Sequence, residues 1–225
     1  MSGQDQKITV CIYTNCHKFA PSAEILKQTY ISFLQTFDPA SEIPVRIYID
    51  PHPDVGKLKK YREKISDTIP GEITITESLS DGYLRSLDDC KTPFIFQLEG
   101  DWLFNGHEIK HSLAEIIDFM QAAEVYHFRF NKRENKAAVW DKVMKPGNLN
   151  SFKFCRSNNM SNNPHIIDRE WYNLDVKKYI AKLPGSKGIE ERLNQVGKYE
   201  SILYGGAGHP ATVTHIDGRD AWRGR

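Results

Sequence analysis

Residues 92–104 read TPFIFQLEGDWLF and combine an apolar strand with a pair of carboxylates. The residues after Pro93 are largely apolar, which is the pattern of a short buried strand. Glu99 and Asp101 come next, separated only by Gly100. Ligands of open α/β sheets bind at the carboxyl ends of strands, and carboxylates there suit Mg²⁺ or Mn²⁺ bound together with phosphate. The alternative is a polar turn in which Gly100 supplies only backbone freedom.

Upstream of this segment, strand and helix patterns alternate along the chain. Short β-branched or apolar runs predict strands, and apolar residues at helical spacing predict the helices between them. This alternation predicts an α/β fold with a mainly parallel sheet and helices on both faces. The expected strands are residues 8–14, 45–49 and 73–76, and the expected helices are residues 24–37, 55–66 and 80–89.

Downstream, the pattern becomes mixed. We predict a helix over residues 107–123, a strand over 125–130, and a polar surface excursion over 131–150. The chain shows no internal repeat and no low-complexity linker, so a single domain over residues 1–225 is expected. The remaining predicted strands are residues 151–155, 165–167, 199–203 and 212–216, and the remaining helices are 171–181 and 189–196.

Composition excludes several classes of protein. The chain has 225 residues, of which 40% are hydrophobic and 26% are charged, as in ordinary globular proteins. A net charge of +1 argues neither for nor against nucleic acid as a partner. No run of about eighteen apolar residues exists and the start, MSGQDQK, is polar, so we expect a cytoplasmic protein without a membrane segment. The four cysteines lack CxxC spacing, and we expect them to be reduced thiols.

Several short motifs resemble those of one enzyme family. The triplet Glu99-Gly100-Asp101 follows the fourth predicted strand, Asp50 ends the second, and residues 188–193 read GIEERL. In these features the chain resembles the A-type nucleotide-sugar glycosyltransferases of the family 2 type, including small enzymes of large viruses and phages. The resemblance implies a GT-A, Rossmann-like fold with a DxD-type metal site. It also implies a nucleotide-binding half of about residues 1–104, an acceptor-binding half of about 105–225, and host cytoplasm if the protein is viral.

The resemblance assigns the acids of the triplet to a metal site. Asp101 would bridge Mn²⁺ or Mg²⁺ to the donor diphosphate, and Glu99 would contact either the metal or the ribose. His215, in the motif THIDG, would complete the metal shell, and His209 in the glycine-rich loop is the second candidate for that place. The cation would neutralise charge on the departing nucleoside diphosphate. Glu99 departs from the pattern, because the family has Asp at the first position.

On the nucleotide side, the resemblance implies a role for five residues. Asp50 would bond the nucleobase or ribose, and Tyr13, Thr14 and Asn15 would lie beside the base. Arg85 would contact the diphosphate. Each has a simpler alternative: Asp50 as a turn residue before a proline, Tyr13 as a core aromatic, and Arg85 as a solvated residue on a helix.

On the acceptor side, the GIEERL segment resembles an element that supplies the catalytic base of inverting members. The base position falls on Glu191, with Glu190 beside it. A carboxylate at a helix start stays ionised and can take a proton from an acceptor hydroxyl. The alternative is an ordinary pair of acids in a first helical turn. Loop residues such as Asn162 and the aromatic Trp171 look like acceptor-side material without a defined role.

The leading prediction is a metal-dependent glycosyltransferase. It would move a hexose or pentose from a nucleoside-diphosphate sugar, UDP-sugar foremost, to a hydroxyl of a glycan, a protein or a modified DNA base. A nucleotidyltransferase is an alternative, although the segment after the first strand, YTNCHKF, lacks a glycine-rich phosphate loop. A third possibility is a non-catalytic module that binds a nucleotide or a sugar.

Overall fold

The structure is a computed structural model that describes residues 6–16, 22–37, 43–138, 141–181, 189–194 and 200–216. Its strands are β1 (Ile8–Asn15), β2 (Val45–Asp50), β3 (Glu72–Ile75), β4 (Phe94–Glu99), β5 (Trp102–Phe104), β6 (His127–Arg129), β7 (Met144–Leu149), β8 (Phe152–Ser157), β9 (His165–Asp168), β10 (Ser201–Tyr204) and β11 (Val213–His215). Its helices are α1 (Glu24–Phe37), α2 (Val55–Ser66), α3 (Leu79–Asp89), the 3₁₀ turn η1 (Gly106–Glu108), α4 (Leu113–Ala122), α5 (Arg169–Trp171), the π turn η2 (Tyr172–Val176), α6 (Lys177–Ala181) and α7 (Ile189–Asn194).

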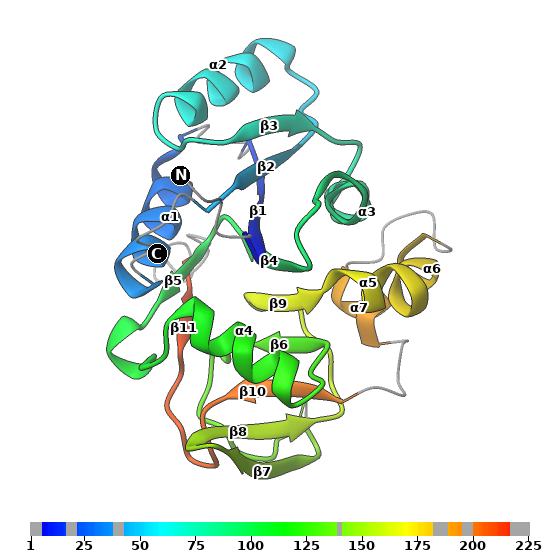
Figure 1. Cartoon of the computed structure of the whole chain (residues 1–225). Helices are drawn as coiled ribbons and strands as arrows, with labels where there is room; N and C mark the ends of the chain where they lie inside the picture. The colour runs from blue at the N-terminus through cyan, green and yellow to red at the C-terminus, as the bar shows by residue number, and fades with distance from the viewer. Residues whose placement is uncertain are drawn as a thin grey trace, which may run out of the picture.

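A nine-stranded sheet runs through the molecule in the order β3-β2-β1-β4-β9-β6-β10-β8-β7 (Figure 1). The pairings make all of these strands run in one direction except β9 and β8. In Figure 1, α1 lies on one side of the sheet, and α3 and α6 lie on the other. The α/β prediction with a mixed, mostly parallel sheet flanked by helices is therefore confirmed.

The strands present two different faces, because successive side chains of a strand point to opposite sides. On β4, Phe96 points to the side of α1 and α4, whereas Gln97 points to the side of α3 and α6. We call the first side the phenylalanine face, after the buried residues Phe33, Phe37, Phe96, Phe104 and Phe130. We call the second the tyrosine face, after the buried residues Tyr13, Tyr48, Tyr83 and Tyr172.

Capping explains where two helices begin. Ser78 caps α3 by accepting a hydrogen bond from the backbone of Asp81, and Ser112 and Glu115 form a capping box at the start of α4. Because this box sets the start of α4, the prediction of a helix over residues 107–123 was wrong at its N-terminal end. The 3₁₀ turn η1 comes first, Ile109 is extended, and α4 begins only at Leu113.

The prediction that residues 131–150 form a polar surface excursion was wrong in part, because the segment contains a strand. Residues Met144–Leu149 form β7, which pairs antiparallel with β8 at the edge of the sheet. Pro146 obscures this strand in the sequence, but an edge strand tolerates proline because one of its sides needs no ladder hydrogen bonds. Asn150 and Ser151 make the turn with φ values of 49° and 71°. Within the described ranges, no helix has the length and apolarity to cross a membrane.

Candidate active site at the carboxyl edge of the sheet

The parallel strands β1, β2 and β4 end at one edge of the sheet. Their register pairs Asn15 with Asp50, and Tyr13 with Glu99. The carboxyl ends of three neighbouring strands therefore bring Thr14, Asn15, Asp50 and Glu99 to the same edge. This is where α/β folds of this kind bind ligands.

The turn between β4 and β5 is tightly packed against β1 and α1. The backbone N–H of Gly100 donates to the carbonyl of Tyr13 at 2.7 Å. A Cβ atom at Gly100 would lie 2.8 Å from Leu26 Cδ1 and 3.2 Å from Thr14 Oγ1. Close approach, and not an unusual φ, thus favours glycine at this position, because a Cβ would have to displace the end of the Leu26 side chain. The hydroxyls of Thr29 and Ser32 on α1 accept from backbone N–H groups of β5 and fix the strand that follows.

Asp101 and His215 come together because β5 pairs with β11. The antiparallel register places His215 opposite Trp102, and the two rings lie 4.5 Å apart between centroids. His215 Nε2 is 3.1 Å from Asp101 Oδ2. The other carboxylate oxygen, Oδ1, is buried and has no hydrogen-bond partner among the described residues. A buried oxygen of this kind is costly unless a cation or a donor satisfies it.

Glu99 has a different partner. The amide Nδ2 of Asn162, in the loop before β9, donates to Glu99 Oε1 at 2.7 Å. In the part of the chain that the structure describes, no three His, Cys, Asp or Glu side chains are grouped to hold a metal ion. The predicted DxD metal site is therefore not seen as a three-ligand cluster of Glu99, Asp101 and His215. An oxygen and an imidazole nitrogen from Asp101 and His215 are nevertheless a donor set that suits Mn²⁺ when phosphate oxygens and water complete the shell.

Asp50 is half-buried at the end of β2. Burial raises the pKa of its carboxyl from 3.8 to about 6. The desolvated carboxylate is present above that pH, and it is a strong acceptor for an N–H or O–H group of a ligand. Asn15, its partner in the register, is exposed beside it.

Tyr13 does not face this edge, and of the two roles considered for its ring, the structure supports that of a core aromatic. The ring is 3% exposed and stacks between those of Tyr48 and Tyr83, with 5.5 Å between centroids on each side. Its hydroxyl donates to Gln97 Oε1 in the tyrosine face. The alternation of strand side chains sends Tyr13 inward and leaves Thr14 at the edge, where its hydroxyl bonds that of Tyr61 at 2.6 Å.

Arg85 lies on the exposed side of α3. Its Nε donates to Asp81 Oδ2 one helical turn earlier, at 2.9 Å. The structure does not bring Arg85 into contact with Asp50, Glu99 or Asp101 by any hydrogen bond or ion pair that it describes. Its role toward a diphosphate stays a prediction.

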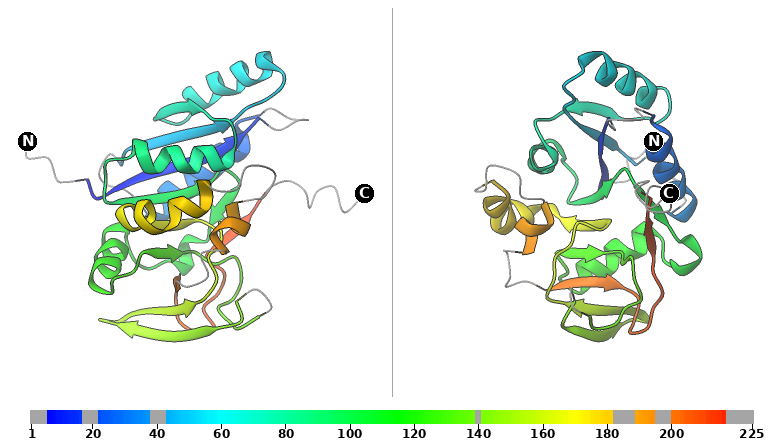
Figure 2. Two further views of the ribbon diagram at one scale, coloured as in Figure 1. Left: turned by 90° about the vertical axis from the view of Figure 1, so that its right-hand side faces the viewer. Right: turned by 180° about the vertical axis from the view of Figure 1, so that it is seen from behind.

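The two acids of the GIEERL segment belong to α7. Ile189 and Leu193 are buried against the tyrosine face, and Arg192 donates to the carbonyl of Ile180 at 2.8 Å. Glu191 lies on the opposite, exposed side of the helix. The side chain of Glu190 lies outside the described residues. Figure 2 (left) shows α7 toward the end of the molecule to which β1 points, so it is at the same end as the carboxyl edge.

Asn162 is the residue of this edge that sequence reasoning left without a role. The amide reaches Glu99 only because β9 inserts antiparallel beside β4, with His165 opposite Gln97. Residues 158–164 read NNMSNNP, which signals a loop, but nothing local signals which strand end the loop will meet. The only signal in the sequence for such a contact was the group of asparagines that precedes a short strand.

No family model and no curated protein sequence matches this chain. Its fold is similar to that of several solved structures. Residues 1–349 of S. aureus TarS match with a TM-score of 0.56 and 12% identity, over 96% of this chain and 62% of that one. The same TarS segment in complex with UDP-GlcNAc matches with a TM-score of 0.56 and 13% identity, over 91% of this chain and 57% of that one.

Two smaller proteins match over nearly their whole length. A CMP:2-keto-3-deoxy-manno-octonic acid synthetase complexed with CTP has a TM-score of 0.56 and 14% identity, over 97% of this chain and 96% of that one. A UDP-glucose pyrophosphorylase complexed with UDP-glucose has a TM-score of 0.52 and 12% identity, over 89% and 91%. At these identities the likeness concerns the fold. The fold of this chain is thus one that other proteins use to bind nucleotides and nucleotide sugars.

Proposed function

We propose that this protein is a metal-dependent glycosyltransferase that uses a nucleoside-diphosphate sugar as donor and a hydroxyl group as acceptor. The observation that carries the proposal is the buried, unpartnered Oδ1 of Asp101 beside His215, at the edge where β1, β2 and β4 end. A diphosphate-bound cation would satisfy that oxygen. The similarity in fold to proteins bound to UDP-GlcNAc, UDP-glucose and CTP supports a nucleotide at the same edge.

Asp101 and His215 are the side chains that would hold Mn²⁺ or Mg²⁺. When bound, the ion supplies positive charge for the departing diphosphate, a contribution of several kcal/mol in enzymes of this chemistry. The packing of Gly100 against Leu26 and Thr14 keeps the turn that carries Asp101 in place. The chain's own part is therefore to present one carboxylate and one imidazole at a fixed position, with little reorganisation on binding.

Asp50 would orient the base of the donor. A carboxylate can accept from the N3–H of uracil or from the amino group of cytosine, and we propose a UDP-sugar as the donor to test first. Because burial raises the pKa of Asp50 to about 6, the acceptor is lost on acidification below that pH. We expect affinity for UDP to fall by up to about tenfold for each pH unit below about 6, and Asp50→Asn to remove this dependence.

Glu191 is our proposed base for the acceptor. Its carboxylate lies on the exposed side of α7, at the same end of the molecule as the carboxyl edge (Figure 2). There it can take the proton of an acceptor hydroxyl as that oxygen attacks the anomeric carbon. Glu190, its neighbour, is the second candidate. This arrangement corresponds to an inverting, single-displacement reaction.

A nucleotidyltransferase is the second candidate function. One observation favours it: this chain matches the CMP:2-keto-3-deoxy-manno-octonic acid synthetase and the UDP-glucose pyrophosphorylase over about nine-tenths of their lengths or more, but it spans only 62% of the TarS chain. Incubation with nucleoside triphosphates and sugar 1-phosphates distinguishes the two, because only a nucleotidyltransferase releases pyrophosphate.

The test of the proposal is donor binding and slow donor hydrolysis. The protein is incubated with Mn²⁺ and a panel of nucleotide sugars, and release of nucleoside diphosphate is measured. Hydrolysis that falls by at least about a hundredfold in Asp101→Asn supports the proposal. The matched control is Asp118→Asn, because Asp118 is exposed on α4 and pairs with Lys7. Calorimetry that detects no nucleoside diphosphate bound, with or without Mn²⁺, would overturn it.

A further inference from the structure

The strand β9 brings a second loop to the candidate site. Because β9 runs antiparallel to β4 and pairs His165 with Gln97, the residues that precede β9 lie next to those that end β4. The contact that results is the 2.7 Å hydrogen bond from Asn162 Nδ2 to Glu99 Oε1. Sequence motifs do not assign a role to Asn162, and the function proposed above does not use it.

The loop that carries Asn162 is anchored to the tyrosine face through His165 and to the segment after β6 through a backbone hydrogen bond. The carbonyl of Asn163 can only accept, so His165 Nδ1 carries the proton of their 2.6 Å bond, and His165 Nε2 accepts from the hydroxyl of Tyr83. Burial lowers the pKa of His165 to about 4, which keeps the ring neutral and this tautomer in place at physiological pH. The next carbonyl, of Pro164, accepts from the backbone N–H of Phe130 at 2.9 Å.

The anchored loop holds Glu99 in one conformation. Glu99 has one more rotatable bond than an aspartate, and a long carboxylate side chain loses binding energy when it must be ordered by the ligand. The charge-assisted bond from Asn162 orders it beforehand. It orders Glu99 on the β9 side, and the described part of the chain has no metal-binding group in which Glu99 joins Asp101 and His215.

We propose that Asn162 is a positioning residue that fixes Glu99 for the nucleotide-sugar donor and keeps it out of the cation's ligand shell. This inference rests on the proposed function, and it defines which acid does what. Glu99 contacts the organic part of the donor, and Asp101 with His215 contacts the ion. The first acid of the triplet is glutamate here where the family has aspartate. With this longer side chain, the carboxylate contacts Asn162 and the donor, and not the ion.

A double-mutant cycle tests the link between the two residues. UDP affinity is measured by calorimetry in the presence of Mn²⁺ for the wild type, Asn162→Ala, Glu99→Ala and the double variant. Loss of one charge-assisted hydrogen bond predicts about a tenfold loss of affinity in Asn162→Ala. In the Glu99→Ala background, Asn162→Ala has no further effect, because it acts through Glu99. Asn158→Ala, an exposed change in the same loop, is the matched control and leaves affinity unchanged.

Two further readouts separate positioning from a general effect on the loop. Binding of Mn²⁺ alone, followed by electron paramagnetic resonance, changes less than about twofold in Asn162→Ala but falls strongly in Asp101→Asn. The isosteric Asn162→Asp removes the amide donor and places a like charge against Glu99, so UDP affinity falls at least as far as in Asn162→Ala.

Three results overturn the inference. These are additive effects in the cycle, an equal loss of Mn²⁺ binding in Asn162→Ala and Asp101→Asn, and an Asn162→Asp variant that binds UDP as tightly as the wild type. If any of these results is obtained while the wild type binds UDP, only the role of Asn162 is overturned and the proposed function is not. A wild type that binds no nucleotide at all overturns the proposed function and this inference together.

Discussion

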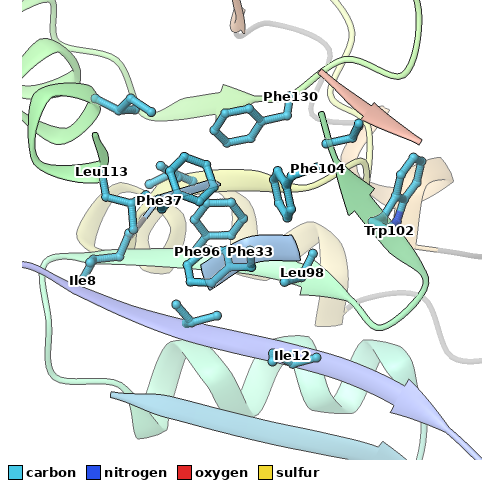
Figure 3. Close-up of a cluster of buried hydrophobic side chains, with 14 of the residues drawn as sticks. Ile8, Ile12, Phe33, Phe37, Phe96, Leu98, Trp102, Phe104, Leu113 and Phe130 are labelled. Carbon is cyan, nitrogen blue, oxygen red and sulfur yellow. The ribbon is translucent and has the colours of Figure 1, made fainter. Parts of the chain in front are cut away.

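Phe96 and Gln97 are neighbours on β4, yet they belong to two differently built halves of the core. Phe96 packs in the phenylalanine face against Phe33, Phe37 and Phe130, with ring centroids 5.2 to 5.8 Å away (Figure 3). Gln97 lies in the tyrosine face, where it accepts from Tyr13 and donates to Ser86. The first face is held by apolar contact, whereas the second combines apolar contact with directional hydrogen bonds.

The difference matters for the site. The phenylalanine face removes apolar area from water, and such burial has little directional preference. The tyrosine face must satisfy each buried hydroxyl, amide and imidazole, so its hydrogen bonds restrict how its elements can be placed. That network reaches His165 and the loop of Asn162. We therefore expect the first face to dominate stability and the second to govern the geometry of the carboxyl edge.

The largest effect is expected from Phe96→Ala. Removing a fully buried ring from the phenylalanine face leaves a cavity and costs about 3–5 kcal/mol in the free energy of unfolding. Denaturant unfolding measures the change. Phe96→Leu keeps most of the volume and is the control, with a clearly smaller loss. A loss below about 1 kcal/mol for Phe96→Ala would contradict the assigned role of this face.

Gln97→Leu probes the tyrosine face at the next position of the same strand. Leucine is similar in size and more apolar, but the hydroxyl of Tyr13 loses its acceptor, and we expect a loss of about 1–3 kcal/mol. Adding Tyr13→Phe removes the unsatisfied donor, so the double variant is more stable than the sum of the two changes predicts. Additive losses in unfolding experiments would mean that this bond does not couple the two residues.

Asp50→Asn is expected to stabilise the protein in a pH-dependent way. The pKa of Asp50 is about 6 in the folded chain and 3.8 without burial, so the folded state binds more protons between these values and stability falls as the pH rises through them. Asparagine does not titrate, so Asp50→Asn does not lose stability over this pH range. Its advantage is absent below about pH 4 and reaches about 1 kcal/mol above about pH 7, less than the full shift implies because the carboxylate is partly exposed and screened. Equal stability of the two proteins at neutral pH would contradict this.

The smallest effect is expected from Arg85→Ala, which lies outside both faces. Its bond to Asp81 is a solvent-exposed pair one turn apart on α3, and such pairs contribute about 0.3–0.5 kcal/mol. We expect unfolding to change by no more than this and UDP affinity to change far less than in Asp101→Asn. A loss of UDP affinity of about tenfold or more would instead support Arg85 as a diphosphate ligand.

Much of the candidate site was visible in the sequence. The strand-then-acid pattern indicates that Asp50, Glu99 and Asp101 follow strands, and the parallel alternation puts the ends of those strands on one edge. His215 was identified from a motif, and the pairing of β11 with β5 places it beside Asp101. The direction of Tyr13 stayed open between the core and the nucleobase, because a run of apolar strand residues does not show which of them ends the core.

The sequence by itself determined the local elements of this protein. Periods of two and 3.6 residues and helix caps such as Ser78 and Ser112 are local signals, since each depends on neighbours a few residues away. Only the tertiary structure decided the antiparallel insertion of β9 and the bond between Asn162 and Glu99. These depend on contacts between distant segments, and their free energy comes from burial and hydrogen bonds that form only when the whole sheet has assembled.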